Sequence, residues 1–149
     1  MKTTFSLILA LCLMKISAHS QILKPVTWSY AAKKTSPSTA TVFIRATVEE
    51  GWHLYSQFIK EGGPVKTTFS FPSSNAYSLI GVTAEPKAVA KYEPSFKMEV
   101  SYFERSVIFQ QKIRLKGKTA SVQGSVEFMV CNDKQCLPPE QVNFSIPIK

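Results

Sequence analysis

Long apolar runs are nearly absent from this chain of 149 residues, and so are the motifs of most enzyme classes. The one continuous apolar run, residues 5–14, is about half as long as a membrane-spanning helix needs to be. The sequence has no GxSxG motif, no HExxH motif and no glycine-rich loop for phosphate. Glu99 and Glu104 do not form a convincing acid/base pair. These absences argue against a spanning helix and against hydrolase, metalloprotease or nucleotide chemistry.

The first twenty residues have the features of a secretory signal peptide. Lys2 supplies a positive n-region, residues 5–14 form an apolar h-region, and Ala18 and Ser20 are small residues at positions −3 and −1. We therefore expect cleavage between Ser20 and Gln21 and a soluble mature protein outside the cytoplasm. Cys12 lies in the apolar run, and Leu11 directly before it is not the small residue that a lipoprotein site needs, so we expect no lipid there.

Positive charge exceeds negative charge only modestly and is not clustered. Eighteen Lys and Arg against ten Asp and Glu give +8, and loss of Lys2 and Lys15 with the signal peptide leaves +6. The basic residues are scattered singly, unlike the basic tract of a nucleic-acid-binding protein. We expect no nucleic-acid partner. The excess of positive charge is compatible with binding to an anionic membrane surface or to an acidic protein partner.

Helical periodicity is missing, and alternation with period two replaces it after residue 38. Four apolar faces result: Val42, Ile44, Ala46 and Val48; Val107, Phe109, Ile113 and Leu115; Val122, Val126, Phe128 and Val130; and Val142, Phe144, Ile146 and Ile148. Shorter candidate strands are "WHLYSQF", "VKTTFSF" and "AYSLIGV", with turn signals between them. Seven or so short strands predict an all-β, immunoglobulin-like antiparallel sandwich. We expect one domain over residues 39–149, preceded by a partly extended arm over residues 21–38.

Cys131 and Cys136, in "FMVCNDKQCLPPE", are the only cysteines after the signal peptide. An even pair in an exported chain is expected to form a disulfide. As a structural staple it would be weak, because closing about six residues contributes roughly 2 kcal/mol. Alternation places Cys131 off the inward face of Val130, at the tip of a hairpin. We therefore predict a pair outside the core that is accessible to other thiols and labile.

Metal binding is a further interpretation of the same cysteines. Zinc needs four ligands, and beyond the two cysteines the chain offers His53 and His19, the latter within the signal peptide. Copper(I) would accept two thiolates, with Met98 or Met129 as a third ligand. Because there is no CxxC motif and no methionine-rich cluster, we expect no metal.

Three segments resemble the N-terminal periplasmic domain of DsbD, the transmembrane thiol:disulfide interchange protein. They are "GWHLYSQFI" (51–59), "YEPSFKMEVSYFERSVIFQQKI" (92–113) and "CNDKQCLPPE" (131–140), in the family's order. The element from the cysteines to Pro138 and Pro139 is the most specific. The resemblance implies an immunoglobulin-like fold, in agreement with the strand pattern, and no cofactor.

The resemblance also implies a function as a thiol-disulfide oxidoreductase component in the periplasm. The domain would receive electrons from a thioredoxin-like donor and reduce oxidised periplasmic proteins, among them disulfide isomerases and cytochrome c maturation factors. Cys131 and Cys136 would cycle between disulfide and dithiol, with Cys136 attacked first. Since this chain lacks the family's transmembrane and thioredoxin-like parts, we expect a monomer with a separate donor, such as a membrane protein of the DsbD type. The alternative is a non-catalytic binding or assembly module with a structural hairpin disulfide.

The resemblance further implies a cap loop whose aromatic ring covers the sulfurs. The matching stretch "KYEPSF" offers Phe96 first and Tyr92 second, and Glu93 would correspond to an acidic residue near the family's cysteines. An ordinary core aromatic is the alternative for Phe96, and a solvated carboxylate is the alternative for Glu93. His53 and Tyr55 fall on the aromatic strand that lines the family's site, and alternation places them on one face.

Overall fold

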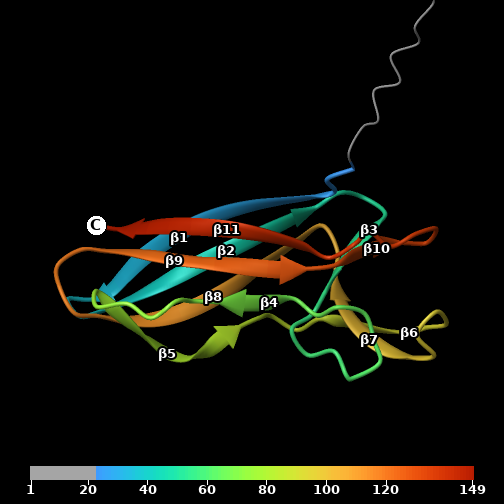
Figure 1. Ribbon diagram of the computed structural model, residues 1–149, viewed down its shortest axis with the longest axis horizontal. Helices are drawn as coiled ribbons and strands as arrows, with labels where there is room; N and C mark the ends of the chain where they lie inside the picture. The colour runs from blue at the N-terminus through green and yellow to red at the C-terminus, as the bar shows by residue number, and fades with distance from the viewer. Residues whose placement is uncertain (1–22) are drawn as a thin grey trace, which may run out of the picture.

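The computed structural model describes residues 23–149, and β-strands account for most of that range (Figure 1). Eleven strands are found there: β1 (Val26–Ser36), β2 (Thr39–Val48), β3 (Trp52–Tyr55), β4 (Thr68–Ser70), β5 (Tyr77–Ala84), β6 (Val89–Glu93), β7 (Met98–Phe103), β8 (Ser106–Leu115), β9 (Ala120–Phe128), β10 (Val130–Asn132) and β11 (Glu140–Ile148). Their pairings are antiparallel. The fold is the immunoglobulin-like antiparallel β-sandwich that the period-two pattern predicted.

The predicted signal peptide, residues 1–20, lies outside the described residues, and so do Cys12 and His19. Within residues 23–149 there is no helix of the length and apolarity needed to cross a membrane.

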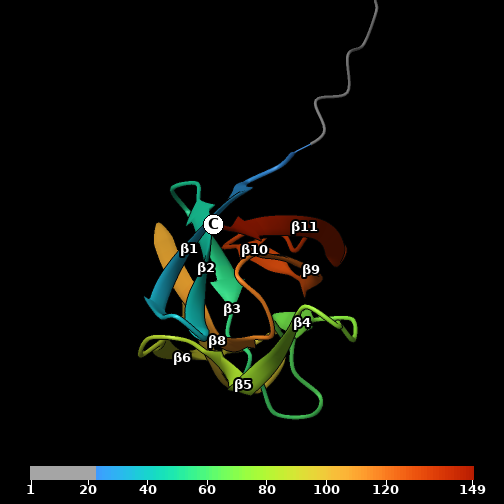
Figure 2. The same cartoon turned by 90° about the vertical axis from the view of Figure 1, so that its left-hand side faces the viewer.

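The strands form three sheets, of which two make the sandwich. One has the order β1-β2-β8-β5, and the facing one has the order β11-β9-β4 (Figures 1 and 2). The third sheet, β10-β3-β7-β6, gathers at one end of the molecule, to the right in Figure 1. This end sheet carries the cysteines, because β10 contains Cys131.

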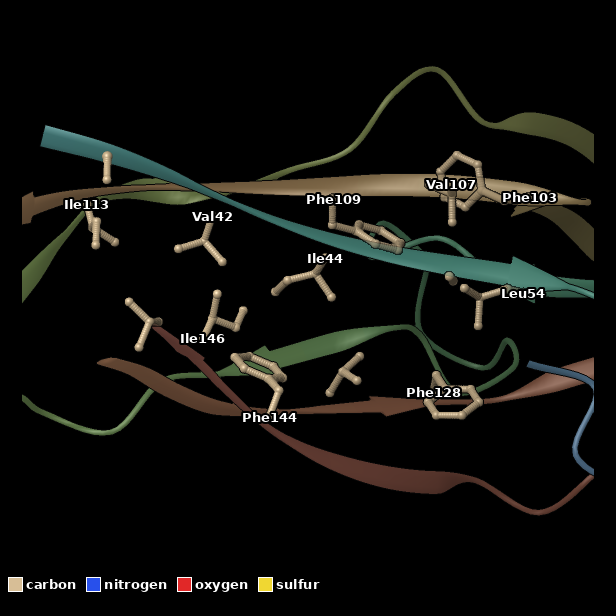
Figure 3. Packing of buried hydrophobic residues seen from close by; sticks show 14 of the residues in the cluster. Val42, Ile44, Leu54, Phe103, Val107, Phe109, Ile113, Phe128, Phe144 and Ile146 are labelled. Atoms are coloured by element: carbon tan, nitrogen blue, oxygen red, sulfur yellow. The ribbon is translucent and has the colours of Figure 1, made fainter. Parts of the chain in front are cut away.

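The main core lies between the two sandwich sheets. Every residue of the four predicted apolar faces is buried except Val142, which is half-buried. Figure 3 shows Ile44 and Phe109 on one side of this core and Phe144 and Ile146 on the other. Phe109 is fully buried, and its ring centroid lies 4.9 Å from that of Phe69 and 5.8 Å from that of Phe103. The apolar alternation thus placed the core correctly.

A buried polar residue interrupts the apolar face of β8. Gln111 is 1% exposed, and its amide Nε2 donates to the carbonyl oxygens of Lys112 (2.8 Å) and Ile80 (3.3 Å). Its Oε1 accepts from the Thr83 hydroxyl at 2.9 Å. The neighbouring strand β5 shifts register between Ile80 and Ala84, where Gly81 has a φ of +69°. Gln111 therefore supplies hydrogen bonds that the irregular stretch of β5 does not receive from the β-ladder.

Residues 26–36, which we predicted to belong to a partly extended arm, form a regular β-strand. They form the edge strand β1, paired with β2 from Val26 opposite Val48 onward. Trp28 and Tyr30 are half-buried against the core, whereas Lys33 and Lys34 are exposed. A short, half-buried apolar pattern followed by two lysines is common on edge strands, which explains why periodicity alone did not reveal it.

Candidate functional site

Cys131 and Cys136 form a disulfide at the tip of a hairpin. Cys131 lies on β10, and the two Cα atoms are 4.0 Å apart in an antiparallel bridge. Asn132 closes the turn between them: its Oδ1 accepts from the backbone N–H groups of Lys134 and Gln135, each at 2.9 Å. Such a side-chain bond to the backbone two residues on is the local preference of asparagine in turns. The sequence "NDKQ" thus folds back on itself and brings the sulfurs together.

The two sulfurs differ sharply in exposure. Cys131 is 2% exposed and packs with Tyr55, Val100 and Tyr102 in a small cluster separate from the main core, while Cys136 is exposed. The prediction that Cys131 points away from the main core is confirmed. The prediction of an accessible pair outside the core was wrong for Cys131, because it packs with Val100 and Tyr102, which lie on β7 of the same sheet. Only Cys136 is presented to solvent.

Strand β3 lies beside the disulfide and divides its side chains between two faces. Trp52 and Leu54 belong to the main core, as alternation requires. His53 is paired in register with Cys131, and its Nε2 lies 3.2 Å from the Tyr55 hydroxyl. Directly opposite residues of an antiparallel pair carry their side chains on the same face, roughly 5 Å apart at Cβ. The predicted placement of His53 and Tyr55 next to the cysteines is what the strand pairing produces.

The hairpin of β6 and β7 forms the opposite wall of the site. Its turn is closed by a bond from the Phe96 N–H to the Glu93 carbonyl at 3.1 Å, with Lys97 in the left-handed region at a φ of 53°. Phe96 is half-buried and meets Tyr55 edge-on, with ring centroids 6.5 Å apart. Tyr92 is 59% exposed and Glu93 is partly buried. Of the three residues of this hairpin that were expected at the site, Phe96 is the one whose ring meets the ring of Tyr55.

A cavity of about 470 Å³ joins the two hairpins and β3. All seven residues expected at the site line it: His53, Tyr55, Tyr92, Glu93, Phe96, Cys131 and Cys136. Tyr102, whose ring centroid is 4.8 Å from that of His53, was missed by the sequence reasoning. The alternation of Met98, Val100 and Tyr102 along β7 was the signal that could have identified it.

A larger cavity of about 710 Å³ lies over β9 and β11 and is unsuited to this chemistry. Its lining includes Gln123, Asn143 and Phe144, and it contains no thiol and no ionisable side chain. The smaller cavity is the one that holds the cysteines, so chemical content rather than size identifies the candidate site.

Glu85 ties the segment that leads into β6 to the end of β3. Its carboxylate accepts hydrogen bonds from the Ser56 hydroxyl, from the Gln57 backbone N–H at 3.0 Å and from Gln57 Nε2 at 3.2 Å. Ser56 is 1% exposed and donates its own N–H to the Ser101 carbonyl of β7 at 2.9 Å. These bonds fix the base of the β6–β7 hairpin relative to the strand that carries His53 and Tyr55.

Burial keeps both ring side chains beside the disulfide neutral at neutral pH. Burial, with a smaller contribution from the negative charge of Glu93, raises the pKa of Tyr55 to about 12. Burial also lowers the pKa of His53 below its usual value, against the opposing effect of Glu93. The site thus holds a protonated phenol and an unprotonated imidazole next to Cys131.

Met98 and Met129, the thioethers considered for copper(I), both pack against the cluster that holds Cys131. No group of three or more His, Cys, Asp and Glu side chains gathers within residues 23–149 in an arrangement that could hold an ion.

Comparison with known proteins identifies one family. The model of the thiol:disulfide interchange protein DsbD, N-terminal, matches residues 20–147. No curated protein sequence matches the chain. Among solved structures, the chain is similar to the N-terminal periplasmic domain of ScsB from Proteus mirabilis, with 15% identity and a TM-score of 0.60 over 85% of this chain. The matched part is 47% of that structure, so this chain corresponds to about half of it.

Two structures from Neisseria meningitidis are also similar. One is the DsbD N-terminal domain in the reduced form, with 13% identity, a TM-score of 0.51, and 78% of this chain and 82% of that chain covered. The other is the complex between the DsbD N-terminal and PilB N-terminal domains, with 13% identity, a TM-score of 0.55, and 84% and 87% covered. At such identities the likeness establishes a common fold.

Proposed function

This chain belongs to the family of DsbD N-terminal domains, and from that membership we propose that it relays electrons in the periplasm by thiol-disulfide exchange at Cys131 and Cys136. The observation that carries the proposal is the unequal exposure of the two sulfurs within one cavity. A disulfide with one exposed sulfur admits attack at that sulfur and keeps the other as the leaving group. We also infer export through residues 1–20 and a mature domain that begins near Gln21.

The exchange begins with the donor and needs no cofactor. A thiolate of a thioredoxin-like donor attacks Cys136 Sγ, the Cys131–Cys136 bond breaks, and Cys131 leaves with the electron pair and takes up a proton. The second thiol of the donor then attacks the mixed disulfide, so the donor is oxidised and Cys136 is released as a thiolate. The domain now holds two electrons as a dithiol.

Delivery to an oxidised periplasmic protein runs the same steps in reverse. The Cys136 thiolate attacks the target disulfide, and Cys131 closes the intramolecular disulfide after losing its proton. A complex of a DsbD N-terminal domain with a second protein domain is known from Neisseria meningitidis, which supports a protein partner in general. The alternative, a binding or assembly module with a structural disulfide, predicts a bridge that resists reduction.

The reduction potential of the disulfide separates these functions. We expect equilibration with glutathione or dithiothreitol buffers, in a Cys12→Ser background, to give a value between roughly −200 and −270 mV, where exchange proteins lie. A value below about −300 mV, or no reduction without unfolding, would leave the binding module as the better account.

Phe96 is expected to slow attack by small thiols on the disulfide. Its edge-on contact with Tyr55 is of a kind worth about 0.5–1.5 kcal/mol beyond buried area. Loss of that contact in Phe96→Ala should therefore shift the hairpin toward an open form and speed reduction by glutathione roughly two- to tenfold. Phe58→Ala is the matched control, because Phe58 is 70% exposed and lies outside the cavity. Equal rates of reduction by glutathione in the unaltered protein, Phe96→Ala and Phe58→Ala would show that Phe96 does not cap the site.

A further inference from the structure

The proposed exchange requires Cys131 to lose and regain a proton in each cycle, although its side chain is 2% exposed. A buried thiolate is disfavoured by desolvation, so direct ionisation of the thiol into water is slow unless a neighbouring group takes the proton. The ionisable side chains of the cavity that are at least half-buried, and could therefore take the proton away from water, are those of His53, Tyr55 and Glu93. They differ in position and in acidity.

We propose that His53 is the proton acceptor for Cys131, and this inference rests on the exchange function proposed above. His53 is the residue paired in register with Cys131, on the strand directly beside β10. It is half-buried and lines the same cavity as Cys131 and Cys136, so its ring is accessible from both the site and the solvent that fills the cavity. A proton taken from Cys131 can therefore continue to water.

The other two candidates fit the role less well. The pKa of about 12 makes Tyr55 a group that keeps its own proton throughout the neutral range. Glu93 lies on β6, at the far edge of the sheet, with β7 and β3 between it and β10. Its Oε1 is also turned toward its own hairpin, where it accepts from the Ser95 N–H at 3.4 Å. Position in the sheet therefore favours His53.

Tyr55 acts as a positioning residue for the imidazole. The 3.2 Å contact between His53 Nε2 and the Tyr55 hydroxyl can be made with Nε2–H as donor, which leaves the lone pair of Nδ1 free to accept a proton. The same bond persists in the imidazolium, because Nε2 keeps its hydrogen. Tyr55 itself is fixed by burial and by the Thr67 hydroxyl, which donates to its carbonyl at 2.5 Å.

The proton and electron pair balance in this step. With Cys136 joined to a target, the Cys131 S–H proton passes to His53 Nδ1, and the Cys131 sulfur attacks Cys136 Sγ. The Cys131–Cys136 bond forms, the bond from Cys136 to the target sulfur breaks, and the target leaves as a thiolate. In the opposite direction the His53 imidazolium returns the proton to the Cys131 thiolate.

Charged and titratable groups surround His53 from each neighbouring element. They are Tyr55 on its own strand, Tyr102 on β7, Lys91 and Glu93 on β6, Glu104 after β7, and Asp133 in the turn after β10. Burial outweighs these charges and lowers the pKa of His53, so the ring is largely in its accepting form at pH 7.

The test separates attack by Cys136 from closure by Cys131. Reduced protein in a Cys12→Ser background is mixed with excess 5,5′-dithiobis(2-nitrobenzoate), and the released thionitrobenzoate is followed by stopped-flow absorbance. The first equivalent reports attack by Cys136 and the second reports closure by Cys131. We expect His53→Gln to slow the second phase about tenfold to a hundredfold at pH 7 and to leave the first within roughly twofold. Lys112→Gln, which removes an exposed charge on β8, is the control and should change neither phase.

The pH profile of the unaltered site tests the inference even if His53→Gln does not fold. We expect the closing rate to rise with pH through the lowered pKa of His53 and to level off, before ionisation of the buried thiol adds a second rise above about pH 8.5, the ordinary thiol value. A closing rate that climbs steadily to the thiol pKa with no inflection below pH 7, or a second phase unchanged in His53→Gln, would overturn the proposal. The assay uses a small disulfide after chemical reduction, so it gives an answer even if the reduction potential shows that the protein is no relay.

Discussion

Replacing Cys131 by serine is expected to leave a protein that accumulates a mixed disulfide at Cys136, whereas replacing Cys136 is expected to leave one that accumulates almost none. Cys136 is exposed, whereas Cys131 is 2% exposed and packs with Tyr55, Val100 and Tyr102. A buried thiol reacts only through local opening of the structure, which at a cost of about 3 kcal/mol slows its reaction by roughly a hundredfold. Both variants should lose the relay entirely, but at different steps.

The measurement is covalent adduct formation followed by mass spectrometry, in a Cys12→Ser background. One probe is glutathione disulfide, and the other is an oxidised thioredoxin-like domain. Cys131→Ser should form adducts at least about a hundredfold faster than Cys136→Ser. Preferential adducts on Cys131 would reverse the order of attack and would mean that the β6–β7 hairpin moves far enough to expose the buried sulfur.

The order of attack depends on where the chain changes sheets. Strand β9 pairs with β11 and ends at Phe128, and β10 pairs with β3 from Val130. Val130 still contributes to the main core, so the next residue, Cys131, must face the other side of the end sheet. The position of one residue in this alternation therefore determines which cysteine becomes the protected sulfur.

Alternation predicts faces but not what covers them. It placed His53 and Tyr55 together on β3 and separated Cys131 from Val130, because those statements need only the period of a strand. The burial of Cys131 depends on Val100 and Tyr102, which reach the site through the pairing of β7 with β3. The alternation along β7 indicates which of its side chains share a face but not that β7 pairs with β3, and for that reason the sequence suggested two accessible sulfurs where the structure has one.

The alternation of apolar and polar residues could not predict the irregular features of the fold. Gln111 occupies an inward position of β8, where a period-two pattern calls for an apolar residue. Its burial is compensated by the register shift of β5 next to Gly81, and neither strand predicts that by itself. Likewise, the bonds from Ser56 and Gln57 to Glu85 join segments that only the folded topology brings together.

Phe109→Ala is expected to cost about 3–5 kcal/mol of unfolding free energy, the usual loss for a large aromatic side chain deleted from a core. Phe109 is fully buried, and it contacts the rings of Phe69 and Phe103, which come from different sheets. Phe69 and Phe103 are each held in place by the strand pairings of their own sheets. Their rings therefore cannot move far into the vacated space, and the cavity should remain largely open. Phe58→Ala is the matched control: Phe58 is 70% exposed, and its truncation should cost about 0.5 kcal/mol or less.

The measurement is denaturant unfolding of both variants with the disulfide oxidised and reduced. The six-residue disulfide loop contributes only roughly 2 kcal/mol, so the loss at Phe109 should exceed the loss caused by reduction. Because Phe103 is paired with Leu54 beside Tyr55, a damaged core should also loosen the end sheet that holds the site. A loss below about 1 kcal/mol would mean that the core repacks freely. The position of Cys131 would then depend on the end sheet alone. The stability of the reduced, dithiol form would likewise depend on the small cluster in which Cys131 packs with Tyr55, Val100 and Tyr102.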